Sequence, residues 1–246
     1  MALISPLTRQ NKQKIYEGSS KDVFQMNDEE STLVLFFKDD LRHKDKKMSI
    51  SGKGAINNLI SSFLMEKIDL VGIENHLIEK SNMREQLVQI LDIVPVQIRI
   101  NNVAIDNYVE NFGVQNGYLF ENPMIEFRVK NKGLGNPSIN ESQITGFNWA
   151  TSKEIEEIKK MSYRINDFLT GYFSALRLRL VECNLEFGRV FNGEDFIFML
   201  GDEITPESCR LWDLESNQKF DIDTIEKSDQ PLEIYKEIVK RMNLKI

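Results

Sequence analysis

Cysteine and histidine are scarce in this chain of 246 residues, which contains only Cys183, Cys209, His43 and His76. Two cysteines are too few for a disulfide scaffold, so a reducing cytoplasm is the expected location. The four residues show no C-x-x-C or H-x-x-x-H spacing, so we do not expect a zinc site. We expect both histidines at the surface and both cysteines as small packing residues.

Long apolar runs and an excess of basic residues are also absent. The longest apolar runs, at residues 33–37 and 196–200, are far too short to span a bilayer. The first ten residues lack the basic and apolar regions of a secretion signal. The net charge of -7 argues against nucleic acid as a main partner, because phosphate binding needs a surplus of lysine and arginine. We therefore expect neither a membrane nor a nucleic-acid partner.

The apolar residues that are present follow strand and helix periodicities in turn. Alternation and turn signals predict strands at residues 15–24, 32–38, 87–100 and 124–130, and a hairpin of 185–191 and 195–200. Helical spacing predicts helices at 54–70 and 232–242, and a long helix that begins with the capping-box pair Thr151 and Glu154. Because hairpins dominate, we expect an α+β fold with mainly antiparallel sheets.

Carboxylates gather at the open end of the late hairpin. Glu186 lies on its first strand, and Asp202 follows its second strand. Mg²⁺ prefers one or two carboxylates together with phosphate oxygens, so these residues are candidate metal ligands. A strict two-residue turn at Asn192-Gly193 places the two acids on opposite faces, so a shared metal requires an odd residue, such as a bulge at Gly193. Solvated charges at strand ends are the alternative interpretation.

The segment Gly18, Ser19 and Ser20, followed by Lys21, lies between strand-like sequences. Small residues let backbone N–H groups approach phosphates, and a lysine adds a point charge. The segment lacks the spacing of a Walker A loop, and a simple turn is the alternative interpretation.

Two further basic residues are candidates for ligand contacts. Lys130 ends the predicted strand 124–130, where it is either a phosphate clamp or the charge of an edge strand. Arg210, in the sequence Arg-Leu-Trp-Asp, either faces a ligand or forms a surface ion pair. The residues alone leave both alternatives open.

Four segments, in this order, match one enzyme family: 14–21 (KIYEGSSK), 52–58 (GKGAINN), 82–86 (NMREQ) and, most specifically, 200–213 (LGDEITPESCRLWD). The chain resembles the SAICAR synthetases of purine biosynthesis from about residue 14 to residue 244. The resemblance implies a two-lobed fold, with an ATP-binding lobe at 1–91, a larger lobe at 92–246 and an ATP cleft between them. It leaves a homodimer open.

The resemblance also implies a reaction, in which ATP drives the joining of L-aspartate to carboxyaminoimidazole ribotide through an acyl phosphate, with the help of Mg²⁺. By motif position, the residues that contact ATP are Gly18, Ser19, Ser20, Lys21 and Lys130. Glu186 and Asp202 are the implied metal ligands, and with Lys130 they form the implied catalytic set. Arg210 is expected to face the ribotide.

The chain departs from the family pattern mainly where the acceptor substrates are expected. Asn101 stands where the family has an arginine, and Asn107 ends a turn (105–107) that replaces Ala-Gly-Ser. Ser19 replaces a lysine of the opening segment. Arg99 shares a strand face with Asn101, and we hypothesise that it takes over the arginine's role. The alternative function is a paralogue that binds Mg-ATP but has lost or changed its acceptor. A kinase-like transferase is disfavoured because H-R-D and D-F-G segments are absent.

Overall fold

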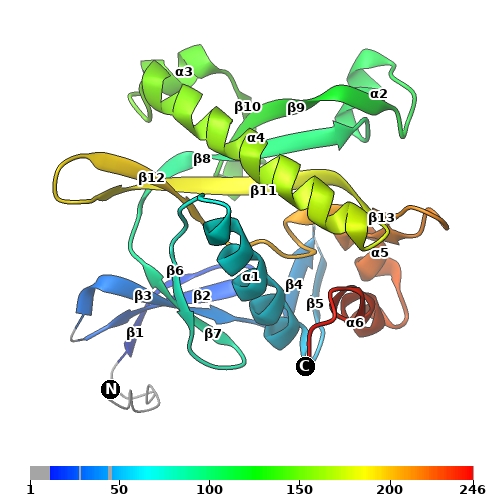
Figure 1. Cartoon of the computed structure of the whole chain (residues 1–246), viewed down its shortest axis with the longest axis horizontal. Coiled ribbons are helices and arrows are strands. Elements are labelled where there is room, and N and C mark those ends of the chain that lie inside the picture. Colours follow the sequence, from blue (N-terminus) through cyan, green and yellow to red (C-terminus); the bar gives the residue numbers. More distant parts are fainter. Residues whose placement is uncertain (1–11, 28, 44–45, 246) are drawn as a thin grey trace.

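Figure 1 shows the computed structural model, which describes residues 12–27, 29–43 and 46–245. Within these residues the strands form a five-stranded sheet (the small sheet), a seven-stranded sheet (the large sheet) and a two-stranded ribbon. The strand pairs of all three are antiparallel. The predicted α+β class is therefore confirmed. In the same residues, no helix has the length and apolar character needed to cross a bilayer.

The small sheet and the ribbon come from the first part of the chain. The small sheet has the order β1-β2-β3-β7-β6. Its strands are β1 (Lys12–Glu17), β2 (Lys21–Met26), β3 (Glu29–Phe37), β6 (Leu77–Lys80) and β7 (Glu85–Gln89), and the ribbon is β4 (Asp40–His43) with β5 (Lys46–Ser49).

The large sheet has the order β10-β9-β8-β11-β13-β14, with β12 also paired to β11. Its strands are β8 (Asp92–Val103), β9 (Leu119–Val129), β10 (Ser138–Ile139), β11 (Leu178–Phe191), β12 (Phe196–Gly201), β13 (Cys209–Asp213) and β14 (Lys219–Phe220). The long strand β11 therefore pairs with three neighbours and carries residues to several parts of the sheet.

Helices lie on both sheets, and α4 runs across the large sheet in Figure 1. They are α1 (Lys53–Leu70), α2 (Asn107–Phe112), α3 (Glu141–Gly146), α4 (Ser152–Ala175), α5 (Ile222–Lys227) and α6 (Pro231–Arg241), with a 3₁₀ turn at Lys132–Leu134. The predicted capping box of α4 is confirmed: Thr151 Oγ1 accepts from the Glu154 N–H at 3.2 Å, and Glu154 Oε2 accepts from the Thr151 N–H at 2.7 Å. These bonds satisfy N–H groups that the helix start leaves free.

One continuous cluster of buried apolar side chains joins the helices to the large sheet. It includes Ile60 of α1, Ile98 of β8, Leu169 of α4, Leu185 of β11 and Ile238 of α6, each at most 1% exposed. Helical residues three or four positions apart and strand residues two positions apart face this core, as their periodicity predicts. Close packing of such a core fixes the helices and sheets relative to one another.

Two predicted strands are wrong in extent. Residues 15–24 form the hairpin of β1 and β2, because the chain turns at 18–20. Residues 87–100 belong to β7 and β8, which lie in different sheets, and the chain crosses between the sheets at residues 90–91. Alternation of apolar residues shows that a segment is extended, but it does not show which partner strand the segment joins.

Candidate active site

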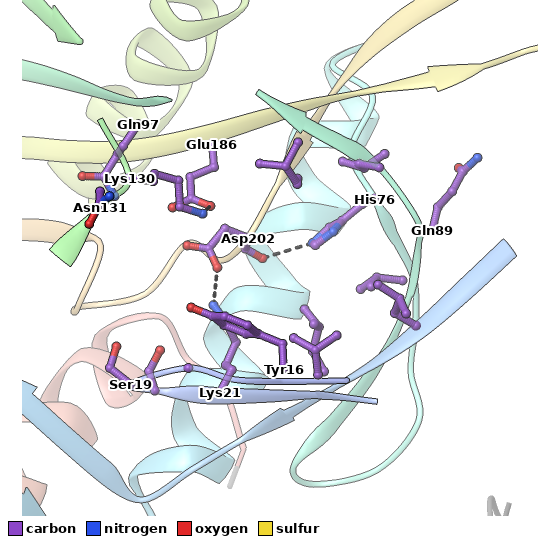
Figure 2. Close-up of a pocket in the computed structure, with 18 of the residues that line it drawn as sticks. Tyr16, Ser19, Lys21, His76, Gln89, Gln97, Lys130, Asn131, Glu186 and Asp202 are labelled. Atoms are coloured by element: carbon purple, nitrogen blue, oxygen red, sulfur yellow. Dashed lines mark hydrogen bonds and ion pairs between the residues drawn. The ribbon is translucent and has the colours of Figure 1, made fainter. Parts of the chain in front are cut away.

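A cavity of about 620 Å³ is lined by residues of both the small and the large sheet (Figure 2). We call it the first cavity. The β1–β2 turn contributes from the small sheet, and β9, β11 and the end of β12 contribute from the large one. Every residue predicted to contact ATP or metal lines this cavity: Gly18, Ser19, Ser20, Lys21, Lys130, Glu186 and Asp202. The structure thus brings together residues up to 184 positions apart in the chain, from Gly18 to Asp202.

The β1–β2 turn is tightly closed at Gly18. The Gly18 N–H donates to the Lys21 carbonyl oxygen at 2.7 Å. A Cβ atom at position 18 would lie only 2.7 Å from that oxygen, so a residue with a side chain does not fit there. The hydroxyl of Ser20 donates to Glu203 Oε1 at 3.0 Å and ties the turn to the loop that follows β12.

Lys21 links the small sheet to two carboxylates of that loop. Its ammonium donates to Asp202 Oδ1 at 2.5 Å and to Glu203 Oε1 at 2.7 Å. Burial disfavours the charged lysine, but the two carboxylates outweigh burial and raise the pKa of Lys21. Burial also opposes ionisation of Asp202, but Lys21 and Lys130 lower the pKa of its carboxyl group. The ion pair is therefore fully charged at neutral pH.

Lys130 donates to Glu186 on the other side of the cavity. Glu186 is 6% exposed. Burial and the negative charge of Asp202 raise the pKa of Glu186 to about 7, although Lys130 acts in the opposite direction. Glu186 and Asp202 both line the first cavity, as the shared-ligand hypothesis requires.

Asp202 faces the cavity because its backbone is left-handed, with φ of 58°. The hairpin loop has four residues, 192–195, in which Asn192 Oδ1 accepts from the N–H groups of Glu194 and Asp195 at 2.9 Å. The loop is therefore neither a strict two-residue turn nor one with a single extra residue, and Glu186 pairs with Gly201. In this register a continued ladder still places residue 202 on the face opposite Glu186. The left-handed backbone of Asp202, and not a bulge at Gly193, turns the Asp202 carboxylate toward the cavity.

His76 was predicted at the surface, and this prediction is wrong. His76 is 6% exposed and lines the first cavity. Its Nε2 lies 3.1 Å from the main-chain oxygen of Asp202 (Figure 2). A carbonyl oxygen only accepts, so Nε2 carries the proton. Burial lowers the pKa of His76 to about 4, so the ring is neutral at physiological pH. The side chain of His43 lies outside the described residues.

The acids of the first cavity fit a hard divalent cation. Glu186 and Asp202 supply carboxylate oxygens to this cavity. The adjacent Glu203 does not line it, and its Oε2 is buried without a hydrogen-bond partner in the structure. The described residues contain no group of three or more acidic, histidine or cysteine side chains arranged around a metal position. Two carboxylates plus phosphate oxygens is the ligand set that Mg²⁺ accepts, so the residues present suit a metal that arrives with a nucleotide.

Two of the predicted acceptor-substrate residues meet at Glu182, which is 2% exposed. Arg99 Nε lies 3.6 Å from Glu182 Oε1 and donates to Asn184 Oδ1 at 3.2 Å. Arg210 Nε lies 3.7 Å from the same Glu182 oxygen. A second guanidinium nitrogen of Arg210 pairs with Asp106 Oδ2 at 3.0 Å. The two arginines are thus held by one buried carboxylate.

Arg210 also lines a second cavity of about 870 Å³, together with Asp106, Trp212, Lys219 and Asp223. The other three predicted acceptor-substrate residues, Arg99, Asn101 and Asn107, line neither cavity. Asn101 is 1% exposed, and its Nδ2 donates to the hydroxyl of Tyr108 at 3.4 Å. Asn107 begins α2, beside the second cavity residue Asp106.

Glu182 and His76 are site residues that the sequence reasoning missed. A signal for Glu182 is present, because Glu182, Asn184 and Glu186 alternate with apolar residues along β11 and so share its polar face. No comparable signal marks His76, because its burial depends on the contact between residues 74–76 and Leu200. The two cysteines are buried packing residues, as predicted.

Known proteins resemble the chain over nearly its whole length. The SAICAR synthetase family model matches residues 14–242. The phosphoribosylaminoimidazole-succinocarboxamide synthase of Rickettsia massiliae is 47% identical over 236 residues, covering 95% of this chain and 100% of the relative.

Solved structures agree with this match. The phosphoribosylaminoimidazole-succinocarboxamide synthase of Ehrlichia chaffeensis has a TM-score of 0.90 at 38% identity, over 95% of this chain and 100% of that chain. A SAICAR synthetase in complex with ADP has a TM-score of 0.87 at 30% identity, over 92% and 96%. With sequence, family model and fold in agreement, the chain belongs to the SAICAR synthetase family.

Proposed function

We propose that the protein is an ATP-dependent ligase that joins L-aspartate to carboxyaminoimidazole ribotide, giving SAICAR in de novo purine biosynthesis. The observation that carries the proposal is the convergence of Lys21, Lys130, Glu186 and Asp202 on one cavity. Membership of the SAICAR synthetase family supports the substrate class, and the ADP complex of a relative supports the use of ATP.

The reaction needs ATP because a carboxylate is a poor electrophile. In the first step a carboxylate oxygen of the ribotide attacks the γ-phosphorus of ATP, the bond to the β-phosphate oxygen breaks, and ADP leaves. The aspartate amine then attacks the acyl carbon, phosphate leaves, the nitrogen loses a proton, and an amide forms. A site for this chemistry must hold phosphate charge in place and keep both reactants aligned.

Lys21 and Lys130 are the residues that bind the nucleotide phosphates. In the structure both are paired with carboxylates, so each exchanges a carboxylate for a phosphate oxygen when ATP binds. The tight turn at Gly18, with Ser19 and Ser20, presents small residues beside the phosphates. Ser19 stands where the family has a lysine, so the charge on this side comes from Lys21.

Glu186 and Asp202 are the residues that hold Mg²⁺. A bound divalent ion supplies positive charge that neutralises the transferring phosphoryl group. The raised pKa of Glu186, caused by burial and by the charge of Asp202, supports a cation at this position. Glu186 must lose its proton to bind the ion, which makes metal binding dependent on pH.

Arg210 and Arg99 are the residues that bind the ribotide, on the side of the large sheet that carries Glu182. Arg99 compensates for the arginine that Asn101 replaces, since Asn101 is buried against Tyr108. Asn107 contributes from the start of α2. Asp106 already occupies one edge of the Arg210 guanidinium, so an anionic ligand must displace it.

The test is a turnover assay of the purified protein with Mg-ATP. We expect ADP to form together with SAICAR, and only when both the ribotide and aspartate are present. Binding of Mg-ATP without turnover at any ribotide or aspartate concentration would instead identify a paralogue with a different acceptor. Calorimetry of ribotide alone separates the two cases, because the ligase binds it and the paralogue does not.

The same proposal covers three further properties. The chain divides into an ATP-binding part at 1–91 and a larger part at 92–246, which is supported by the crossing between sheets at residues 90–91. The protein works in the cytoplasm, which is supported by its two free, buried cysteines. The third is the oligomeric state, for which sedimentation equilibrium tests the homodimer that the family resemblance leaves open.

A further inference from the structure

The segment of residues 74–76 forms hydrogen bonds with the backbone on both sides of Gly201, at Leu200 and at Asp202. Before Gly201, the Leu200 N–H donates to the Glu74 oxygen, and the His76 N–H donates to the Leu200 oxygen, each at 3.0 Å. After Gly201, His76 Nε2–H donates to the Asp202 oxygen at 3.1 Å. The segment is itself anchored, because the Gln89 N–H of β7 donates to the His76 oxygen at 2.8 Å.

These contacts act on a residue in an unfavourable conformation. Asp202 has a left-handed backbone, which residues other than glycine adopt rarely. That conformation directs its carboxylate toward Lys21, and a relaxed strand conformation at the same residue turns the carboxylate to the other face of β12. The main-chain oxygen of Asp202 therefore has to be held for the side chain to stay in the cavity.

From this geometry we infer that His76 is a positioning residue, whose Nε2–H bond to the Asp202 main chain keeps the Asp202 carboxylate aimed at the metal of the bound nucleotide. The inference deepens the proposed function and rests on it. Space filling alone does not explain an imidazole at this position, because an apolar side chain of similar size fills the volume equally well. The hydrogen-bond donor is the property that matters.

Three variants separate the donor from the volume. His76→Leu and His76→Met fill the space without a donor, and His76→Gln keeps an N–H donor on a side chain of similar length. Asn75→Ala is the matched control, because Asn75 Nδ2 donates to the Met65 oxygen of α1 at 3.0 Å and does not reach Asp202. Its loss removes this bond and the one that Asn75 Oδ1 accepts from the Leu77 N–H at 3.1 Å, both of them structural bonds of the same segment.

The experiment measures Mn²⁺ binding at saturating ADP from the electron paramagnetic resonance signal of the free ion. We expect His76→Leu and His76→Met to weaken Mn²⁺ binding about 10- to 100-fold, as loss of a supporting hydrogen bond behind a metal ligand does elsewhere. His76→Gln is expected to restore most of the affinity. Asn75→Ala is expected to lower the melting temperature and leave Mn²⁺ binding unchanged. ADP binding in EDTA, measured by calorimetry, should be the same in all variants.

Two results would overturn the inference while leaving the proposed function intact. One is wild-type Mn²⁺ affinity in both donor-free variants. The other is an equal loss of ADP affinity with and without metal, which shows that His76 contacts the nucleotide or shapes the cavity as a whole. A wild-type protein that binds no Mn²⁺ with ADP overturns the inference and the proposed metal site together.

Discussion

Glu186 and Glu154 each pair with a cation beside strand β11, but their environments shift their pKa values in opposite directions. Lys130 donates to Glu186, yet burial and the charge of Asp202 raise the pKa of Glu186 to about 7. Arg189 of β11 donates to Glu154 at 2.6 Å, and this bond, with the N–H of Thr151, lowers the pKa of Glu154 to about 2. Glu186 lines the first cavity, and Glu154 caps the exposed start of α4.

Under the proposed function, the difference separates an acid that binds a ligand from an acid that stabilises the fold. Glu154 is more stable as a carboxylate in the folded protein than in water, so its charge stabilises the structure. Glu186 is less stable as a carboxylate than in water even though it pairs with Lys130, so its ionisation destabilises the structure until a further positive charge, such as a divalent ion, binds beside it. Perturbations of the second kind are concentrated at functional sites. Substitution of Glu186 should therefore lower activity without lowering stability, and substitution of Glu154 should lower stability without lowering activity.

The largest effect is expected for Glu186→Gln. Loss of a metal ligand should lower kcat/KM by about 10³-fold, equivalent to about 4 kcal/mol of transition-state stabilisation. The folded-state pKa of about 7 lies above the ordinary value of 4.5. The ionised form therefore lowers stability as pH rises from about 4.5 to about 7, and the neutral glutamine should leave the melting temperature at pH 8 equal or higher. Steady-state kinetics and thermal unfolding check both points.

Glu154→Gln is the matched control for that experiment, and it should retain full turnover. The comparison fails if Glu186→Gln keeps its activity, or if the two variants lose activity equally.

A smaller effect is expected for Lys130→Met. Removal of the ammonium frees Glu186 for a metal ion, so Mn²⁺ alone should bind about tenfold more tightly than to the wild type. ATP should bind more weakly, because Lys130 is also proposed to bind the ATP phosphates. Electron paramagnetic resonance and calorimetry measure the two affinities.

Lys159→Met gives the control for charge alone, since Lys159 pairs with Glu156 and Glu141 on the helical surface. If Lys159→Met changes Mn²⁺ binding as much as Lys130→Met, net charge explains the effect and the local pairing does not.

The Asp106→Asn substitution tests whether Asp106, like Glu186, affects ligand binding more than it affects the fold. Asp106 is half exposed and holds Arg210 at 3.0 Å, so its neutralisation should raise the affinity for the ribotide about tenfold. Glu110 also lines the second cavity, so Glu110→Gln removes a negative charge there and is the control. Equal ribotide affinity in the wild type and in Asp106→Asn, measured by calorimetry, places Asp106 with the structural acids.

The smallest effect is expected for the stability of Glu154→Gln. The depressed folded-state pKa means that the stabilisation is fully present above about pH 4.5 and is lost as pH falls toward about 2. At pH 7 the variant should be destabilised by about 0.5–1 kcal/mol, because solvent screens an ion pair near the protein surface. Urea unfolding at several pH values checks this, and a difference that persists unchanged at pH 3 contradicts it.

The residues alone marked Glu186 and Asp202 as candidate ligands and left solvated charges as the alternative, and the resemblance to the SAICAR synthetases then singled them out together with Lys21 and Lys130. Lys21, Lys130, Glu186 and Asp202 all line the first cavity as the motifs indicated. The α+β class also followed from periodicity and from the capping box at Thr151. These features depend on local sequence, which a single chain records.

Features that depend on contacts between distant segments were not predictable. The register of the β11–β12 hairpin did not follow from the sequence, because Asn192-Gly193 suits both a two-residue turn and the observed four-residue loop. The burial of His76 and the left-handed Asp202 arise together, from a contact between residues 74–76 and the end of β12. Neither has a local periodic signal.

The most direct test of the central claim is a crystal structure of the protein with ADP and Mn²⁺, located by its anomalous signal. We expect one Mn²⁺ between the carboxylates of Glu186 and Asp202, at about 2.1 to 2.2 Å from their oxygens, close to the spacing that Mg²⁺ adopts. Lys21 and Lys130 should have turned from these acids to the phosphates. ADP bound outside the first cavity, or an ion held without either carboxylate, would contradict the account.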